Sequence, residues 1–245
     1  MVGGRSARDD VRLELMGGFR LLVGGAPADL VGNAERLLAY LALTGPVARA
    51  VAAGALWPDV SERRGLASLR TAIWQCNRAV DGLVEAGERR LALAGFVRVD
   101  TAALADLAAM PDDAAAGVLR TLRGELLPGW YDDWVLLDRE RLRHLRVQGL
   151  EDVAIRLAAR GSFAAAYALA FEAVRCEPLR ESAHRAVIAV HLAQHNVVEA
   201  VREYRRFRRL LVDDLGVEPS ADLAELVFGA HRAGLVGAQP AASRH

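Results

Sequence analysis

Apolar and polar side chains alternate along the first part of the chain. The alternating apolar positions are Val11, Leu13, Leu15, Phe19, Leu21 and Val23. A period of two, interrupted by the glycine pairs at 17–18 and 24–25, predicts short antiparallel strands joined by glycine turns. The short apolar segment Leu30-Val31 follows, and we expect it to be a further small strand.

From residue 33 the spacing of apolar residues changes to that of helices. Asn33 can cap a first helix that Gly45-Pro46 would end. The expected buried face of this helix holds Leu37, Leu38, Leu41 and Ala42. A second helix, which tolerates Gly54, is expected to run to Trp57. Short helices that follow strands predict a compact N-terminal domain.

A third helix is predicted within Leu56–Leu83. Pro58 and Asp59 interrupt what precedes it, Ser61 can cap its free amides, and Glu62 suits its first turn. Apolar residues then recur at steps of three and four, which places them on one narrow stripe facing a core. The stripe consists of Leu66, Leu69, Ile73, Cys76, Val80 and Leu83.

The other side of this third helix carries donors that can reach phosphates and base edges. They are Arg63, Arg64, Arg70, Thr71, Trp74, Gln75 and Arg78. The pattern is typical of a recognition helix for DNA. An ordinary solvated face is the alternative, because Glu62, Asp81 and Glu85 dilute the charge. Trp74 is out of place on a solvated face, and it can equally pack against a neighbouring strand.

A basic hairpin is expected at residues 90–99. Leu91 and Leu93 alternate with small residues before Gly95, and Val97 and Val99 continue the pattern. Three arginines at its ends would contact the DNA backbone: Arg89, Arg90 and Arg98. Strands, three helices and a hairpin in this order predict a winged helix, in which the third helix enters the major groove.

The chain from residue 101 onward is expected to be almost entirely helical, without a second sheet. Pro111-Asp112-Asp113 and Leu127-Pro128-Gly129 should interrupt the helices. Ala166 and Ala200 stand 34 residues apart in similar helix starts, which is the tetratricopeptide period. A degenerate array of helical hairpins is predicted, and such arrays offer a concave surface to other proteins.

Composition narrows the class of protein. The 245 residues have zero formal net charge at 53% hydrophobic content, and all 31 basic residues are arginine. Arginine forks suit phosphate and guanine, although a GC-rich genome produces the same bias. Cys76 and Cys176 lack metal or redox spacing and are expected to be reduced core residues. With no apolar run long enough for a membrane span, we expect a soluble, cytoplasmic protein.

The sequence gives only weak signals for catalytic or metal-binding sites. His191 and His195 lie one helical turn apart, and His184 lies seven residues upstream of His191. The glutamate of a zinc-protease helix is absent, so we expect no metal and no cofactor. The carboxylate pairs Asp132-Asp133 and Asp213-Asp214 are more typical of helix ends than of acid–base catalysis. No phosphate loop or nucleophile elbow is present. We therefore predict that the protein is not an enzyme.

The densest run of cations lies in a later helix. It comprises Arg202, Arg205, Arg206, Arg208 and Arg209, interleaved with inward-facing Tyr204, Phe207 and Leu210. A solvated face is one interpretation. The alternative is a contact with the DNA backbone or with an acidic partner such as a polymerase subunit.

Several longer motifs carry a family resemblance. Gly-Gly-Phe-Arg-Leu near the start, Arg-Leu-Leu-Ala-Tyr-Leu-Ala-Leu at 36–43, Ala-Leu-Trp-Pro-Asp at 55–59 and Leu-Arg-Thr-Ala-Ile-Trp at 69–74 resemble the DNA-binding domain of the actinobacterial antibiotic regulatory protein (SARP) family, which is related to response-regulator effector domains. Leu-Leu-Pro-Gly-Trp-Tyr-Asp-Asp-Trp-Val at 126–135 and Leu-Gly-Val-Glu-Pro-Ser at 215–220 resemble the bacterial transcriptional activator domain.

This resemblance implies a winged helix at residues 1–100, a tetratricopeptide-like activator domain at 101–235 and a disordered tail at 236–245. It further implies a homodimeric activator that binds direct repeats in double-stranded promoter DNA and contacts RNA polymerase. Gln75 and Asn77 stand where relatives often carry basic residues, and the hairpin at 90–99 is short. The rival interpretation is a protein-interaction adaptor whose winged helix has lost or weakened DNA binding.

Overall fold

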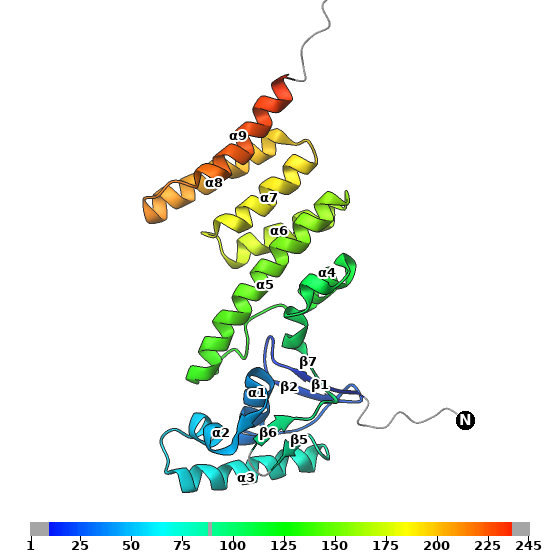
Figure 1. Ribbon diagram of the computed structural model, residues 1–245, viewed down its shortest axis with the longest axis vertical. Coiled ribbons are helices and arrows are strands. Elements are labelled where there is room, and N and C mark those ends of the chain that lie inside the picture. Colours follow the sequence, from blue (N-terminus) through cyan, green and yellow to red (C-terminus); the bar gives the residue numbers. More distant parts are fainter. Residues whose placement is uncertain (1–9, 88–89, 237–245) are drawn as a thin grey trace, which may run out of the picture. The chain divides into compact units, whose positions relative to one another are not determined.

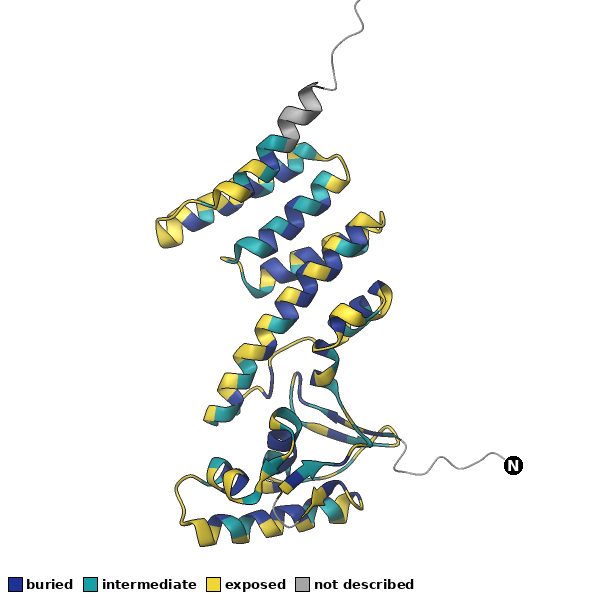
Figure 2. Cartoon of the chain, viewed as in Figure 1, coloured by how far each residue is buried: buried dark blue, intermediate teal, exposed yellow. Residues whose placement is uncertain are grey.

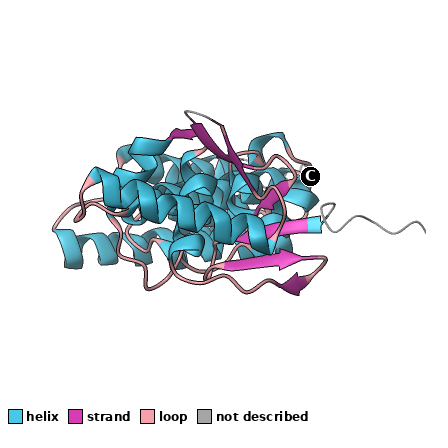
Figure 3. Ribbon diagram, turned by 90° about the horizontal axis from the view of Figure 1, so that it is seen from below, coloured by secondary structure: helices cyan, strands magenta, loops and turns pink. Residues whose placement is uncertain are grey.

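The computed structural model of the protein describes residues 10–87 and 90–236, and side chains as far as residue 229. It is mainly helical with a small number of short strands, which confirms the predicted composition of the fold (Figures 1 and 3). The chain divides into two compact units. The first contains the residues up to 106 together with 120–144, and the second contains 107–119 and the residues from 145 onward.

The first unit contains a four-stranded sheet in the order β3-β2-β1-β7. Its strands are β1 (Val11–Glu14), β2 (Arg20–Val23), β3 (Ala26–Pro27) and β7 (Val97–Val99). The predicted antiparallel pairing of the first two strands is confirmed, with Leu13 opposite Leu21. The expected strand at Leu30-Val31 is wrong. Gly24 and Gly25 have φ of 59° and 83°, so the turn is tight and places the third strand directly at Ala26–Pro27.

A second, three-stranded sheet has the order β4-β6-β5. Its strands are β4 (Val47–Ala48), β5 (Val84–Ala86) and β6 (Arg90–Leu93). The predicted hairpin over 90–99 is therefore wrong, because β6 is paired on both edges and its hairpin partner is β5. A turn in which Val97 N–H donates to the Ala94 carbonyl directs the chain into the other sheet, where β7 lies parallel to β1.

The three expected helices are present in the first unit. They are α1 (Asn33–Thr44), α2 (Arg49–Leu56) and α3 (Glu62–Ala79). Their apolar faces are buried as predicted, although Ala42 and Leu66 remain half-buried. α3 packs against both α1 and α2. Gly45, with a φ of 73°, ends α1 at the position expected.

The two predicted side-chain caps are wrong. Asn33 lies inside α1 rather than before it, and its Oδ1 accepts a hydrogen bond from Nε1 of Trp57 at 3.3 Å. Ser61 does occupy the N-cap of α3, but its side chain makes no capping bond. The Ser61 carbonyl instead accepts the first helical hydrogen bond from the Gly65 N–H at 2.9 Å.

Residues 120–144 complete the first unit. Leu127 is fully buried, and its N–H donates to the Leu15 carbonyl at 2.9 Å. The Arg139 guanidinium donates to the carbonyls of Leu126, Leu127 and Trp130 at 2.8–2.9 Å. Trp134 meets Tyr40 of α1 edge to face, with ring centroids 5.2 Å apart. This segment is therefore part of the N-terminal core.

The second unit is a succession of antiparallel helices. Its helices are α4 (Asp112–Thr121), α5 (Asp133–Ala159), α6 (Phe163–Cys176), α7 (Glu181–Ala193), α8 (Val197–Leu215) and α9 (Ala221–Val236). The last residues of α4 and the first part of α5 lie within 120–144 and so belong to the first unit. The structure describes no strand after residue 100, apart from an isolated bridge between Leu126 and Met16.

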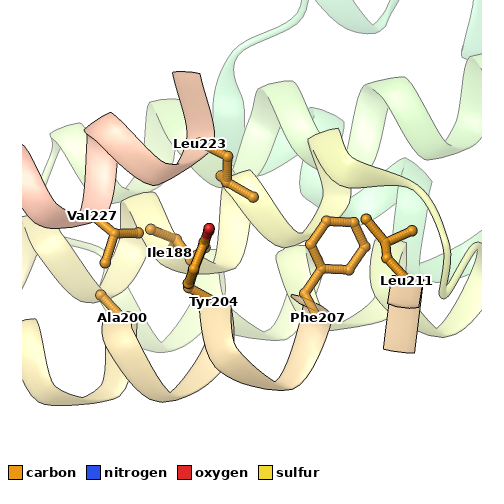
Figure 4. Packing of buried hydrophobic residues seen from close by; sticks show 7 residues of the cluster. All are labelled: Ile188, Ala200, Tyr204, Phe207, Leu211, Leu223 and Val227. Carbon is orange, nitrogen blue, oxygen red and sulfur yellow. The ribbon is translucent and has the colours of Figure 1, made fainter. Parts of the chain in front are cut away.

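The predicted repeat has a structural counterpart in α6 and α8. Ala166 and Ala200 each occupy the fourth position of their helix, and both are fully buried. α7 packs against α6 and α8, and α8 packs against α9. Figure 4 shows the core between α7, α8 and α9, where Phe207 lies among aliphatic side chains. The small side chains of Ala166 and Ala200 let neighbouring helices approach closely.

The chain end and the cysteines differ in part from expectation. α9 continues to Val236, one residue into the tail expected at 236–245, and residues 237–245 lie outside the described residues. Cys76 is a buried core residue, and burial raises the pKa of its thiol to about 12. Cys176 is only half-buried, and its sulfur accepts a hydrogen bond from Arg146 at 2.9 Å.

Candidate nucleic-acid interface

The exposed face of α3 brings together nearly all the residues predicted for a recognition helix. Six of them are solvent-exposed and follow one another at helical spacing along one side: Arg63, Arg64, Arg70, Thr71, Trp74 and Arg78. Gln75 lies at the margin and is half-buried. Figure 2 shows exposed residues along one side of α3 and buried residues on the side toward the core. Ala67, which the sequence pattern did not single out, is exposed on the same face.

The α3 arginines are not neutralised within the fold. Among the residues the structure describes, no carboxylate forms an ion pair with Arg63, Arg64, Arg70 or Arg78. The Arg78 guanidinium instead lies over the Trp74 ring, with its central carbon 5.2 Å from the ring centroid, in a cation–π contact. The face therefore offers uncompensated positive charge to a polyanion.

Trp74 lies beside a loop rather than against a strand. Its side chain remains 58% exposed. A hollow of about 290 Å³ separates this part of α3 from the segment before α1, and Asp29, Leu30 and Val31 line the opposite wall. Of the two interpretations of Trp74, packing against a neighbouring strand is wrong, because the segment at 29–31 is not a strand.

Asn77 serves the fold rather than the surface. Its side-chain amide donates to the Val84 carbonyl at 3.1 Å, and its Oδ1 accepts the Val84 N–H at 2.8 Å. The residue thus joins the end of α3 to the start of β5. A basic residue at this position has no acceptor for the Val84 N–H, which explains this departure from the family pattern.

The three arginines expected at the hairpin do not form one group. Arg90 is exposed at the start of β6. Arg89 lies outside the described residues. Arg98 is exposed but belongs to β7, where it stands opposite Arg12 in the other sheet. Sequence reasoning missed Arg49, whose Nε donates to the Gly87 carbonyl at 3.1 Å and ties α2 to the β5–β6 hairpin.

The arginines of α8 are largely paired within the second unit. Arg202 pairs with Glu199, Arg206 pairs with Glu203, and Arg208 forms a two-point contact with Glu218. Arg205 and Arg209, one helical turn apart, are exposed and have no ion-pair partner among the described residues. Only these two of the five predicted partner-binding residues retain free charge.

The histidines predicted as a weak metal motif are used separately. His184 is fully buried, with Nδ1 2.7 Å from Glu203 Oε1 and Nε2 2.8 Å from the Pro178 carbonyl. His191 contacts the Tyr167 ring. Burial raises the pKa of Glu203, but the His184 hydrogen bond and the Arg206 charge outweigh it, so that the pKa is lowered. No group of three or more metal-ligating side chains occurs in the described part of the chain.

Known proteins resemble both parts of this chain. Residues 91–227 match the family described as the bacterial transcriptional activator domain. Regulatory protein AfsR of Streptomyces coelicolor is 29% identical over 187 residues, which cover 70% of this chain and 19% of that protein. The structure of Mycobacterium tuberculosis EmbR in complex with a low-affinity phosphopeptide superposes with a TM-score of 0.73 at 22% identity, over 91% of this chain and 65% of that one.

A matched segment of more than half the chain defines the protein as one of the bacterial transcriptional regulators. The chain belongs to the bacterial transcriptional activator domain family. The resemblance to SARP-type regulators is confirmed. The chain spans about a fifth of the length of AfsR, and the likeness to EmbR establishes the fold alone. None of the described helices is long and apolar enough to cross a membrane.

Proposed function

We propose that this protein is a sequence-specific, DNA-binding transcriptional regulator that reads promoter DNA with α3 in the cytoplasm. The observation that carries the proposal is the set of four arginines on the exposed face of α3 without ion-pair partners in the described fold. In this reading residues 1–100 form a winged helix, with α1, α2 and α3 as its helices and the β5–β6 hairpin as its wing. The wing contributes Arg90.

Each group on α3 has a role that follows from its chemistry. Arginine forks bind phosphate oxygens or the paired acceptors of guanine, and Gln75 can bind adenine. Arg63 and Arg64 lie in the first turn, where the positive end of the helix dipole adds to their attraction for phosphate. Arg78, held over Trp74, is already ordered for contact.

The helical part of the chain, residues 101–235, would act as a tetratricopeptide-like module that contacts other proteins. Arg205 and Arg209 suit an acidic surface, such as one on RNA polymerase, which would make the regulator an activator. The same face of α8 does not suit self-association, because antiparallel docking of two copies centred on this face would set Arg205 of each copy against Arg209 of the other. A homodimer would therefore use another surface.

We propose that the bound site is a direct repeat. The family resemblance implies tandem docking of two copies in the same orientation. Half-sites then need a spacing of about one helical turn, roughly 10–11 bp, so that both α3 helices meet the same face of the duplex. Insertion of about five base pairs turns one half-site to the far side.

The direct test starts from duplexes selected from random DNA by the full-length protein. Binding of a labelled selected duplex, measured by fluorescence anisotropy, should weaken steeply with salt because phosphate contacts release counterions. Replacing Arg64 and Arg78 by alanine should reduce affinity at least ten-fold. The matched control replaces Arg205 and Arg209, which removes the same charge from the second unit. Equal binding by wild type and the α3 variant would refute the proposed reader.

The rival function is a protein-interaction adaptor that no longer binds DNA. Neutral net charge and the half-buried Gln75 favour it. In that case selection would enrich no sequence, and the salt dependence would be the same for the α3 and α8 variants. The orientation of the selected half-sites separates the two arrangements on DNA, because head-to-tail docking requires direct repeats and a two-fold dimer requires inverted repeats.

A further inference from the structure

An apolar strip runs along the middle of the exposed face of α3, beside the exposed Arg70. Ala67, Thr71 and Trp74 follow one another there at steps of four and three. The Thr71 hydroxyl donates to the Ala67 carbonyl at 3.3 Å, so the helix itself uses the polar part of this side chain and its methyl group remains. Arg63 precedes this apolar strip and Arg78 follows it.

A second apolar side chain faces this strip across the hollow beside Trp74. Val31 is 70% exposed and Trp74 is 58% exposed, which places both among the more exposed large apolar residues of the described chain. Two such groups lining one hollow leave considerable apolar area in water. The strip and the hollow form one surface that a suitable apolar ligand would cover.

We infer that this surface recognises the C5-methyl groups of thymine in the major groove. The inference rests on the proposed function, namely that α3 enters the groove. The thymine methyl is the apolar group that base pairs present there, and alanine, threonine methyl and aromatic side chains are its usual partners. Asp29 and Arg78 line the same hollow with opposite charges, so the hollow does not favour phosphate, and its apolar groups suit a base edge.

The length of the strip predicts how many base pairs it reads. Seven residues separate Ala67 from Trp74, which is about 10.5 Å along a helix at 1.5 Å per residue. Successive base pairs are about 3.4 Å apart, so the strip covers about three base-pair steps. The bound half-site should thus contain a short run of A·T pairs between positions contacted by Arg63 and Arg78.

The test replaces thymine by uracil, which removes only the methyl group. Duplexes selected from random DNA are resynthesised with uracil at each thymine in turn, and affinities are measured by fluorescence anisotropy. Each uracil in the central run should weaken wild-type binding about four-fold, the factor expected for one buried carbon group. Uracil outside this run should have no effect.

Two variants assign the effect to the strip. Thr71→Ser keeps the hydroxyl and removes the methyl, and Trp74→Ala removes an exposed ring, so both should fold normally. Each variant should bind the thymine duplex and the duplex with uracil at one central position with equal affinity. Arg90→Ala should lower the affinity for both duplexes without changing the ratio of the two affinities. Unchanged thymine-to-uracil ratios in both strip variants would overturn the inference while leaving DNA binding intact. Absence of any salt-dependent duplex binding by the wild type would instead overturn the proposed function together with the inference.

Discussion

α3 and α8 are both amphipathic helices rich in arginine, but they differ in how many of their arginines form ion pairs. On α3, four exposed arginines have no ion-pair partner in the described fold. On α8, three of five are paired with glutamates of the same unit. A count of basic residues would rank α8 as the stronger polyanion ligand. The contacts reverse that order, because only uncompensated charge attracts a partner.

The spacing of acidic residues explains this difference. Glu199 and Glu203 each precede an arginine by three residues on α8, and side chains three apart are neighbours on a helix. Glu62 is the one acidic residue of α3, and the positions three and four residues later are Gly65 and Leu66. Within α3 itself, therefore, no arginine has an acidic residue three or four positions away, and this can be seen in the sequence.

The largest expected effect concerns DNA binding after charge reversal. Arg63→Glu combined with Arg70→Glu should weaken binding to a selected duplex at least 100-fold, because each change removes a contact worth about 1–3 kcal/mol and adds repulsion. The comparison variant is Arg205→Glu combined with Arg209→Glu, which changes net charge equally. It should alter affinity less than about three-fold in the same anisotropy assay.

Equal losses in these two variants would show that net charge, rather than the α3 face, controls binding. The assay should be run at two salt concentrations, since α3 variants should also lower the slope of log affinity against log salt. Circular dichroism of both variants checks that the exposed substitutions leave the helices intact.

Local pattern predicted the helices well and the pairing of strands poorly. The bounds of α1, α2 and α3 follow from period, glycine and proline, which act over a few residues. The partner of β6 does not, because a three-residue strand such as Val84–Ala86 has too little pattern to detect and its pairing depends on the whole fold. Arg98 was misplaced for this reason.

The same limit applies to side chains on the candidate interface. Exposure of Arg63, Arg70 and Trp74 followed from helical spacing. The role of Asn77 did not, since its two bonds reach a strand that the sequence did not reveal. Ala67 was missed because an alanine carries no chemical signal of its own, and only its exposure beside Trp74 gives it significance.

A smaller effect should distinguish Asn77 from Gln75 on α3. Asn77→Ala leaves the Val84 N–H and carbonyl without these partners and should lower the free energy of unfolding by about 2 kcal/mol. The Gln75 side chain makes no hydrogen bond within the described part of the chain, so Gln75→Ala should leave stability unchanged while weakening DNA binding if Gln75 contacts a base. Urea titration measures the first quantity. A Gln75 variant as unstable as the Asn77 variant would contradict this division of roles.

The pair between His184 of α7 and Glu203 of α8 should give an effect of about 1 kcal/mol that depends on pH. The folded pKa of Glu203 lies below its ordinary 4.5, so its carboxylate stabilises the fold above that pH, and this contribution is lost as the pH falls through the lower folded value. Glu203→Gln keeps the shape and an acceptor for His184 but removes the charge. The stability difference between wild type and variant should be largest near pH 7.

Denaturant titrations from pH 7 to pH 3 test this expectation. Other lowered carboxyl groups, such as Glu181, act equally in both proteins and cancel in the difference. A difference that stays constant or grows as the pH falls would mean that the charge of Glu203 does not stabilise the second unit.

The smallest expected effect is that of an exposed ion pair. Arg202→Ala removes the contact with Glu199, whose side chain is 39% exposed beside a 70% exposed arginine, so the loss should be under about 1 kcal/mol. Because both groups are solvated, 1 M salt should remove most of it. Arg70→Ala on α3 is the matched variant: it removes an exposed arginine without an ion pair and should leave the free energy of unfolding unchanged at either salt concentration. A larger loss of unfolding free energy for Arg70→Ala than for Arg202→Ala would mean that the α3 arginines stabilise the fold. The proposed difference between the two helices would then be wrong.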